Sequence, residues 1–279
     1  MEKCWFKRID LHYHTIESDG QDTIKDSYDK ILEYEIVPAL VVTNHLNSKY
    51  RASYQKTRDN AEKIRLQENK PIIIGLELAL KPEVLDTEIL VFGTSLCEEI
   101  DRQYEKINSC GYRMLVDLKN EFKGAYIQCH PKTTGEIDIR LAMALNGVEI
   151  TVGSFLHPHY NSILKWLKDL SRPEINYRIW PYANSDGHAI LPDPLLSLKD
   201  SGGFLGQSYN YFEQDIRSER ELIDAITTSP PVRRFRINKQ DFVFDDQKFL
   251  LYPVKSKRKS REYVQYVSDL KKKEKWFFA

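Results

Sequence analysis

The sequence predicts an α/β fold built on a mostly parallel β-sheet that curls into a barrel. Short apolar runs rich in Val, Ile and Leu alternate along the chain with longer stretches of helical spacing. Histidine and acidic residues follow several of these runs, at the points where strands would end. Because the carboxyl ends of barrel strands meet at one face, these side chains should converge on a single site.

The first half of the chain alternates regularly between the two patterns. A strand is expected at about 7–12, and residues 23–32 have helical spacing with Thr23 as a suitable N-cap. The further elements expected in this half are strands at 38–43, 72–76 and 88–92 and helices at 53–68, 97–110 and 113–119.

The second half continues the alternation and then departs from it. Expected here are strands at 125–129, 147–151 and 178–183 and helices at 137–145 and 160–171. Pro230 and Pro231 interrupt the pattern, and a β-like segment follows at 242–254. We therefore expect one α/β domain over residues 1–252 and a short extension over 253–279.

Charge is balanced overall but uneven along the chain. The 279 residues include 41 Lys and Arg and 41 Asp and Glu, so the average field does not favour a polyanionic partner. Residues 255–279, however, carry nine basic and three acidic residues and end in an aromatic cluster. This basic extension is either a solvated segment or a contact for nucleic acid or a partner protein.

The cysteines and the N-terminus indicate a cytoplasmic protein. The four cysteines are widely spaced and form no CxxC pair, which is typical of reduced thiols rather than a disulfide framework. The N-terminus has no apolar segment of the kind found in secretory signals, and no apolar run approaches the about 20 residues that span a bilayer. No membrane association is expected.

A pair of histidines separated by one residue points to a metal. His12 and His14 lie in the run Asp10-Leu11-His12-Tyr13-His14, and an extended strand directs alternate side chains to the same side. Two adjacent imidazoles at a strand end can hold one divalent metal ion. Further ligand-type residues follow later apolar runs: His45, Glu77, His130, Asp186 and His188.

Taken in order, these motifs resemble those of the PHP (polymerase and histidinol phosphatase) domain. The resemblance covers about residues 5–235, and the segment 218–226 is similar to the late helix of that family. It implies a distorted (β/α)7 barrel with two or three divalent metal ions that hydrolyse phosphate esters. The matching motifs are residues 10–15, 18–20, 43–45, 75–77, 130–131 and 185–188.

The resemblance also implies a role for each candidate ligand. His12, His14 and Asp186 would bind a first metal, and Glu77 would bridge metals. Asp19, His45 and His188 would bind a second, and His130 would complete a third site beside Glu77. Imidazole and carboxylate ligands suit Zn, Mn or Fe. Such a cluster can supply a metal-bound hydroxide near neutral pH, so no nucleophilic side chain is required.

The sequence departs from the family pattern at two positions. Leu90 occupies the place of a histidine in the strand at 88–92, and Glu88, on the same side of that strand, is the alternative ligand. Whether Glu88 binds metal or is structural stays open. The Asp-His pair of the second motif is Asn44-His45 here, which loses a carboxylate.

A few other residues have two readings each. Lys132 and His159 are candidate substrate contacts. The alternative is that Lys132 is a solvated lysine and that His159 lies in a surface loop without contact to substrate. Asp10 either orients a ligating histidine or is a simple strand-end acid, and Glu149 is either structural or near the site. Cys129 should point away from the face of His130, as a small buried residue.

The function expected is metal-dependent hydrolysis of a phosphate ester. A small phosphomonoester or nucleotide fits the neutral overall charge, whereas a nucleic-acid phosphodiester fits the basic extension. The alternative is a non-catalytic module that binds metal or a phosphorylated ligand and docks a partner through its C-terminal extension.

Overall fold

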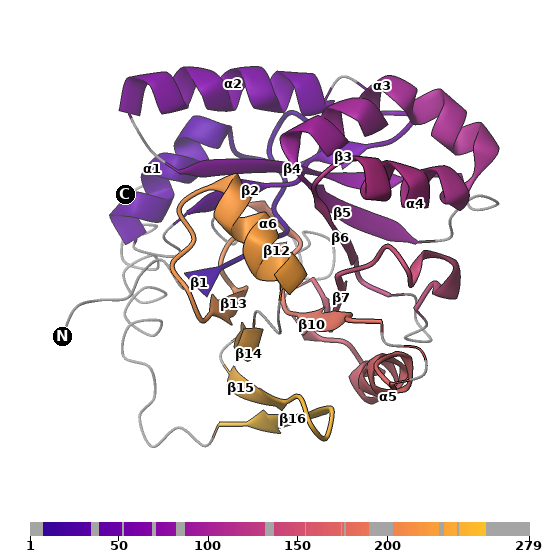
Figure 1. Cartoon of the computed structure of the whole chain (residues 1–279). Helices are drawn as coiled ribbons and strands as arrows, with labels where there is room; N and C mark the ends of the chain where they lie inside the picture. Colours follow the sequence, from indigo (N-terminus) through magenta and orange to yellow (C-terminus); the bar gives the residue numbers. More distant parts are fainter. Residues whose placement is uncertain are drawn as a thin grey trace.

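The chain forms a mixed α/β fold with one curled sheet covered by helices and a second, antiparallel sheet beside it (Figure 1). The computed structural model describes residues 8–34, 39–51, 53–68, 71–81, 87–131, 137–153, 155–173, 175, 177–189, 203–228, 232–238 and 240–254. Residues 255–279, which carry the basic extension, lie outside the described residues, so the expected division at 252/253 stays a prediction.

The curled sheet contains the strands that the sequence predicted, with shifted ends. Its strand order is β10-β7-β6-β5-β4-β2, and β3 pairs with the far end of β4. All neighbours are parallel except β5, which runs antiparallel to β4 and β6. Residues 80–87 between β4 and β5 are fewer than the dozen or so that a parallel crossover needs. The strands are β2 (Leu40–Val42), β3 (His45–Leu46), β4 (Ile72–Ala79), β5 (Glu88–Phe92), β6 (Ala125–Gln128), β7 (Gly147–Glu149) and β10 (Trp180–Tyr182).

Helices cover the outside of this sheet through amphipathic faces. In α3 the buried side chains include Leu96, Ile100, Tyr104 and Ile107, which recur at helical spacing and pack toward β4 and β5. Thr23 caps α1 as predicted, since its Oγ1 accepts the backbone N–H of Asp26 at 3.0 Å. Figure 1 shows α2, α3 and α4 along the top of the view. The helices are α1 (Ile24–Tyr34), α2 (Ser53–Glu68), α3 (Thr94–Cys110), α4 (Tyr112–Glu121), α5 (Tyr160–Leu170) and α6 (Glu219–Thr228).

The prediction of a helix at 137–145 is wrong. Only a short 3₁₀ turn forms there, Ile139–Leu141, followed by irregular turns. The side chain of Asp138 accepts the backbone N–H of Arg140 at 3.0 Å, and such local bonds favour a tight turn over a helix. The apolar residues of this segment still reach the core, since Leu141 and Ala142 are buried.

The antiparallel sheet was only partly expected. Its order is β1-β13-β14-β15-β16, and it contains the predicted β-like segment as the hairpin of β15 and β16. The strand expected at 7–12 is only two residues long, because pairing with β13 ends at Ile9. The strands are β1 (Arg8–Ile9), β13 (Ser208–Phe212), β14 (Val232–Ile237), β15 (Gln240–Asp245) and β16 (Leu250–Pro253), and two small pairs add β8 (Thr151–Val152) with β9 (Phe155–Leu156) and β11 (Gly187–Ala189) with β12 (Gly203–Phe204).

The segment after β1 bridges two parts of the curled architecture. The backbone N–H of Thr43, just after β2, donates to the carbonyl of Tyr13 at 2.9 Å. On the other side, Gly187 accepts from the N–H of His14 at 2.8 Å and donates to the carbonyl of His12 at 3.1 Å. Both histidines thus sit on a buried segment held from two sides, as a distorted barrel would hold it.

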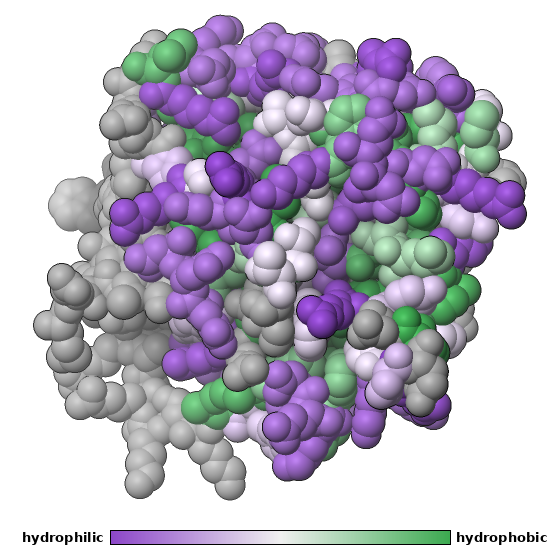
Figure 2. All heavy atoms as spheres, viewed as in Figure 1, coloured by the Kyte–Doolittle hydropathy of each residue, from purple (hydrophilic) through white to green (hydrophobic). Residues whose placement is uncertain are grey.

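One face of the described chain is mainly polar. Figure 2 shows hydrophilic side chains over most of the visible described face, with smaller apolar patches between them. Among the described residues, no helix combines the length and apolar character needed to cross a bilayer. Cys97, Cys110 and Cys129 are free thiols.

Candidate metal centre

The structure brings all eight principal candidate ligands into one cluster. His12 and His14 follow β1, His45 lies in β3, Glu77 in β4 and His130 directly after β6. The remaining three come from the loop before α1 and the region of β11: Asp19, Asp186 and His188. The convergence of strand ends predicted from the sequence is therefore present, although metal ligation by these residues stays a prediction.

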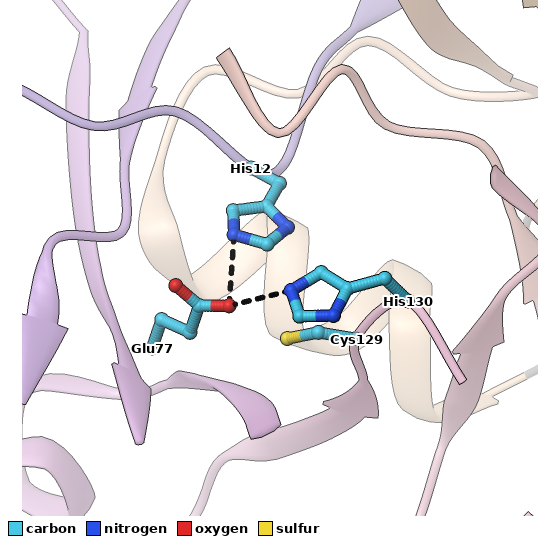
Figure 3. A group of neighbouring side chains, drawn as sticks. All are labelled: His12, Glu77, Cys129 and His130. Atoms are coloured by element: carbon cyan, nitrogen blue, oxygen red, sulfur yellow. Dashed lines mark hydrogen bonds and ion pairs between the residues drawn. The ribbon is translucent and has the colours of Figure 1, made fainter. Parts of the chain in front are cut away.

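Glu77 lies at the centre of the cluster and is fully buried. Its Oε1 lies 3.1 Å from His12 Nε2 and 3.1 Å from His130 Nε2 (Figure 3). Its Oε2 lies 3.2 Å from His14 Nε2 and 2.8 Å from His45 Nδ1. A single carboxylate thus faces four imidazole rings, two on each oxygen, which is the arrangement expected of a bridging ligand.

Two further carboxylates flank the central one. Asp186 Oδ1 lies 3.4 Å from His12 Nε2 and 3.5 Å from His14 Nε2. Asp19 Oδ2 lies 3.2 Å from His45 Nε2, and its Oδ1 lies 3.5 Å from His188 Nε2. Both side chains are partly exposed, unlike Glu77, so they mark the side on which the cluster opens to solvent.

Four overlapping groups bring ligand atoms within 4.8 Å of one another. One group matches the first metal site that the resemblance implied, and another contains the three residues of the second site together with His14. The third implied site gains Cys129. The groups are His12, His14 and Asp186; His14, Asp19, His45 and His188; His12, Glu77, Cys129 and His130; and His45, Glu77 and Glu88.

Buried ring nitrogens in this cluster lack hydrogen bonds. His12 Nε2, both ring nitrogens of His14, His45 Nδ1 and Glu77 Oε2 are buried without a hydrogen-bond partner. Each of them faces a carboxylate or an imidazole of the cluster at 2.8–3.7 Å without hydrogen-bond geometry. A divalent cation would satisfy several of them at once, and the imidazole and carboxylate donors fit Zn, Mn or Fe. The residues present therefore fit a metal centre.

The charges in the cluster shift the pKa values of its members. Burial opposes the charged form of His45, but the carboxylates of Glu77 and Asp19 outweigh it and raise its pKa to about 11. Burial likewise opposes charge on His130, yet Glu77 raises its pKa to about 9. Burial favours neutral Glu77, but the charges of His12 and His45 hold its pKa well below the usual range. Without metal, His45 and His130 are thus imidazolium groups paired with the Glu77 carboxylate.

Metal binding should therefore release protons. Near pH 7, His45 and His130 are protonated in the metal-free protein, with a pKa of about 11 and about 9, and only the neutral ring can bind a cation. Apparent zinc affinity should rise about tenfold per pH unit for each proton displaced. Calorimetric titration in two buffers of different ionisation enthalpy measures this release, and equal heats in both buffers would contradict it.

Glu88 takes a place beside the cluster that Leu90 cannot fill. Leu90 pairs with Glu77 across β4 and β5 and is fully buried. Two residues earlier, Glu88 Oε2 lies 3.3 Å from His130 Nε2. Burial and the nearby charge of Glu77 raise the pKa of Glu88. The structure thus places Glu88 beside His130 at the edge of the cluster, while its ligation stays a prediction.

Cys129 differs from its expected orientation. It is buried as predicted, but its Sγ lies on the same side as the His130 ring and within reach of Glu77 (Figure 3). The alternation of side chains that predicted the opposite direction applies only within a regular strand. β6 ends at Gln128, and the backbone N–H of Cys129 donates to the carbonyl of Glu88 at 2.8 Å.

The two candidate substrate contacts remain untested. Lys132 lies outside the described residues, and His159 is exposed at the start of α5. Its neighbour His157 is the buried member of that pair. His157 Nδ1 accepts the N–H of His159 at 3.0 Å, so Nε2 carries the proton that it donates to the carbonyl of Pro131 at 2.9 Å. His157 thereby anchors the chain directly after His130.

Asp10 holds backbone rather than an imidazole. Its oxygens accept the backbone N–H groups of His12 at 3.3 Å, Ser185 at 3.0 Å and Gly206 at 2.9 Å. Burial raises its pKa to about 6, although these bonds oppose the rise. The carboxylate that contacts Nδ1 of the His12 ring is instead Glu149, at 2.9 Å, a residue for which the sequence left a structural role and a place near the site open. Its place at the end of β7, like the other strand-end donors, was the available signal.

Comparisons with known proteins identify no family for this chain. No family model and no curated protein matches it. Nine solved chains match in structure. One is a protein from Bifidobacterium adolescentis ATCC 15703, provisionally named a metal-dependent phosphoesterase, with a TM-score of 0.44 and 11% identity over 78% of this chain and 95% of that one. At this level of similarity the neighbour establishes neither the family nor the activity of this chain.

Proposed function

We propose that this chain is a metal-dependent phosphoesterase of the PHP type. The observation that carries the proposal is the buried carboxylate of Glu77, which faces four histidines between the two flanking carboxylates of Asp19 and Asp186. The order of these residues along the chain, which resembles the PHP motifs, supports the same conclusion. The distorted (β/α)7 barrel and the use of two or three ions belong to this proposal.

The donor set favours a catalytic over a structural metal site. A structural zinc site is typically closed by four ligands, whereas this cluster offers more donors than one ion needs. Exposure also increases from the centre to the rim: the side chain of Glu77 is 0% exposed, and that of Asp19 is 35% exposed. The buried residues would hold the ions, and the rim would admit the phosphate group.

In this proposal the buried residues of the cluster would bind the ions, and the partly exposed residues would contact the substrate. Divalent ions bound here would lower the pKa of a water molecule and polarise the phosphoryl oxygens. Glu77, His12 and His14 are fixed by burial and would hold the ions in place. Asp19 and His188 lie at the partly exposed side, where the ester would approach. The described cluster needs no serine or cysteine nucleophile for this chemistry.

The chemistry of the cluster indicates the class of substrate, a phosphate ester, and not the individual compound. A small phosphomonoester or nucleotide and a nucleic-acid phosphodiester are both phosphate esters that such a centre can hydrolyse. We favour a small ester, because the zero net charge offers no extended field for a polyanion. Steep salt dependence of oligonucleotide binding by the full chain would instead favour the diester.

The test is metal content measured together with turnover. The full chain, purified without chelator, is analysed for elements and assayed on a chromogenic phosphomonoester and a phosphodiester, before and after EDTA treatment. We expect two or more divalent ions per chain, turnover that EDTA abolishes, and recovery with zinc or manganese. A chain that takes up no metal after reconstitution contradicts the proposal. Metal without turnover on any ester would favour the binding module.

A further inference from the structure

Glu149, the last residue of β7, has a buried side chain that accepts three hydrogen bonds. Its Oε1 accepts from His12 Nδ1 at 2.9 Å and from Asn184 Nδ2 at 2.8 Å. Its Oε2 accepts the backbone N–H of His130 at 2.8 Å. One carboxylate therefore joins two members of the cluster that are 118 positions apart along the chain.

The surrounding contacts determine which atom donates the proton in each of these three hydrogen bonds. The backbone N–H of His130 can only donate. Asn184 Oδ1 accepts the backbone N–H of Leu11 at 3.1 Å, so its amide nitrogen is the group that faces Glu149. Both carboxyl oxygens thus serve as acceptors, and the proton of the third bond must lie on His12 Nδ1.

This proton determines which nitrogen of His12 is free. In a neutral imidazole with the proton on Nδ1, Nε2 carries the lone pair. Nε2 is the nitrogen that faces Glu77 Oε1 at 3.1 Å and Asp186 Oδ1 at 3.4 Å. Histidines that bind metal almost always donate their other N–H to a carboxylate or carbonyl in this way.

We propose that Glu149 is a positioning residue of the metal centre. It selects the His12 tautomer whose Nε2 lone pair faces the cluster, and its second oxygen holds the backbone of His130. This inference rests on the proposed metal-dependent function. Asp10, also a buried acid near His12, does not share this role, since its bonds go to backbone N–H groups and to the Ser185 hydroxyl.

A glutamine could not replace this carboxylate. Glutamine has nearly the same volume but offers one acceptor oxygen and one donor amide. In one orientation its amide would face the N–H of His130, and in the other it would face His12 Nδ1 and Asn184 Nδ2. Either orientation sets donor against donor, so Glu149→Gln breaks the arrangement with little change in packing.

The test compares Glu149→Gln and Glu149→Ala with wild type and with Glu219→Gln. Glu219 is the matched control, because it also joins two segments by accepting the backbone N–H and hydroxyl of Thr94, at the start of α3. Zinc affinity of the full chain is measured against a competing chelator. The imidazole nitrogens of His12 are followed by NMR in ¹⁵N-histidine protein, and unfolding of the metal-free variants is recorded.

We expect Glu149→Gln to weaken zinc binding by about 10–100-fold and to shift the Nδ1 proton signal of His12, because the charged acceptor is lost in either orientation. Glu219→Gln should leave both unchanged. Unaltered zinc affinity in Glu149→Gln overturns the inference alone, as does weakened affinity with an unaltered His12 signal, which would mark a purely structural role. A wild-type chain that binds no zinc overturns the proposed function as well. If Glu149→Ala does not fold, Glu149→Gln decides.

Discussion

Replacing Glu77 with glutamine should abolish both metal binding and hydrolysis. The loss should exceed the about 10–100-fold cost of removing a residue that only supports a ligand. Each oxygen of Glu77 faces two ring nitrogens, at 2.8–3.2 Å. An amide would place a donor opposite two of these nitrogens and would remove the buried negative charge that faces all four rings. Elemental analysis and turnover of the full chain check this result.

The matched comparison for Glu77 is Glu88→Gln. Glu88 meets one histidine, His130, at 3.3 Å, and its side chain is 30% exposed. Solvent can therefore compensate for much of its loss, and we expect a smaller decrease in metal content and activity. Equal effects of the two substitutions would contradict the central role of Glu77, and normal metal content in Glu77→Gln would contradict the site itself.

The sequence predicted the members of the cluster because their signal is local. Each ligand-type residue except Asp19 follows an apolar run, and strand ends in an α/β architecture meet at one face. Asp19 was implied only by the resemblance. His12 and His14 share one side even though β1 ends at Ile9, because bonds to Gly187 and Thr43 keep the segment extended. Alternation of side chains therefore held along this segment, and failed at Cys129, which lies beyond the end of β6.

The features that the sequence did not predict depend on contacts between distant segments. Nothing local distinguishes Glu149, whose bonds to His12 and Asn184 span much of the chain, from an ordinary strand-end acid. The helix expected at 137–145 failed because a side chain of that segment satisfied a backbone N–H locally. The antiparallel sheet pairs β1 with β13 across almost 200 residues, and no period in the sequence specifies such pairing.

The departure at Asn44 has a physical explanation in the structure. Asn44 is buried, and its Oδ1 accepts the N–H of Thr15 at 2.7 Å and the hydroxyl of Ser18 at 2.9 Å. Its Nδ2 donates to Thr15 Oγ1 and Thr57 Oγ1, each at 2.7 Å. The Thr15 hydroxyl donates its own proton to Glu17. This hydroxyl therefore presents a lone pair to Asn44.

The second hydroxyl is committed in the same way. Thr57 Oγ1 donates its proton to the carbonyl of Ser53, at 2.7 Å, within α2. An amide at position 44 matches these partners with one acceptor and one donor, whereas a carboxylate has no donor to offer. Asn44 thereby fixes the loop at 15–18, which leads to Asp19, and an aspartate would disturb that loop.

Asn44→Asp should consequently destabilise the metal-free protein by about 3 kcal/mol. The buried carboxyl, facing lone pairs, would have a raised pKa in the folded state, and its protonated form could restore one donor. A raised folded-state pKa means that stability is retained below the unfolded value of about 4 and lost as pH rises above it. Denaturant unfolding at several pH values, with EDTA present, should show a deficit that grows with pH.

Asn47→Asp is the matched control for this substitution, three residues away on the other side of β3. Asn47 Oδ1 accepts the backbone N–H groups of Lys49 at 2.9 Å and Tyr50 at 3.1 Å, and a carboxylate oxygen can accept both. We expect its stability to stay within about 0.5 kcal/mol of wild type, as for surface substitutions. Similar losses in both variants would mean that negative charge in this region is the cause. A loss confined to Asn44→Asp would show that the donor of Asn44 is required, and no loss would refute this account of the departure.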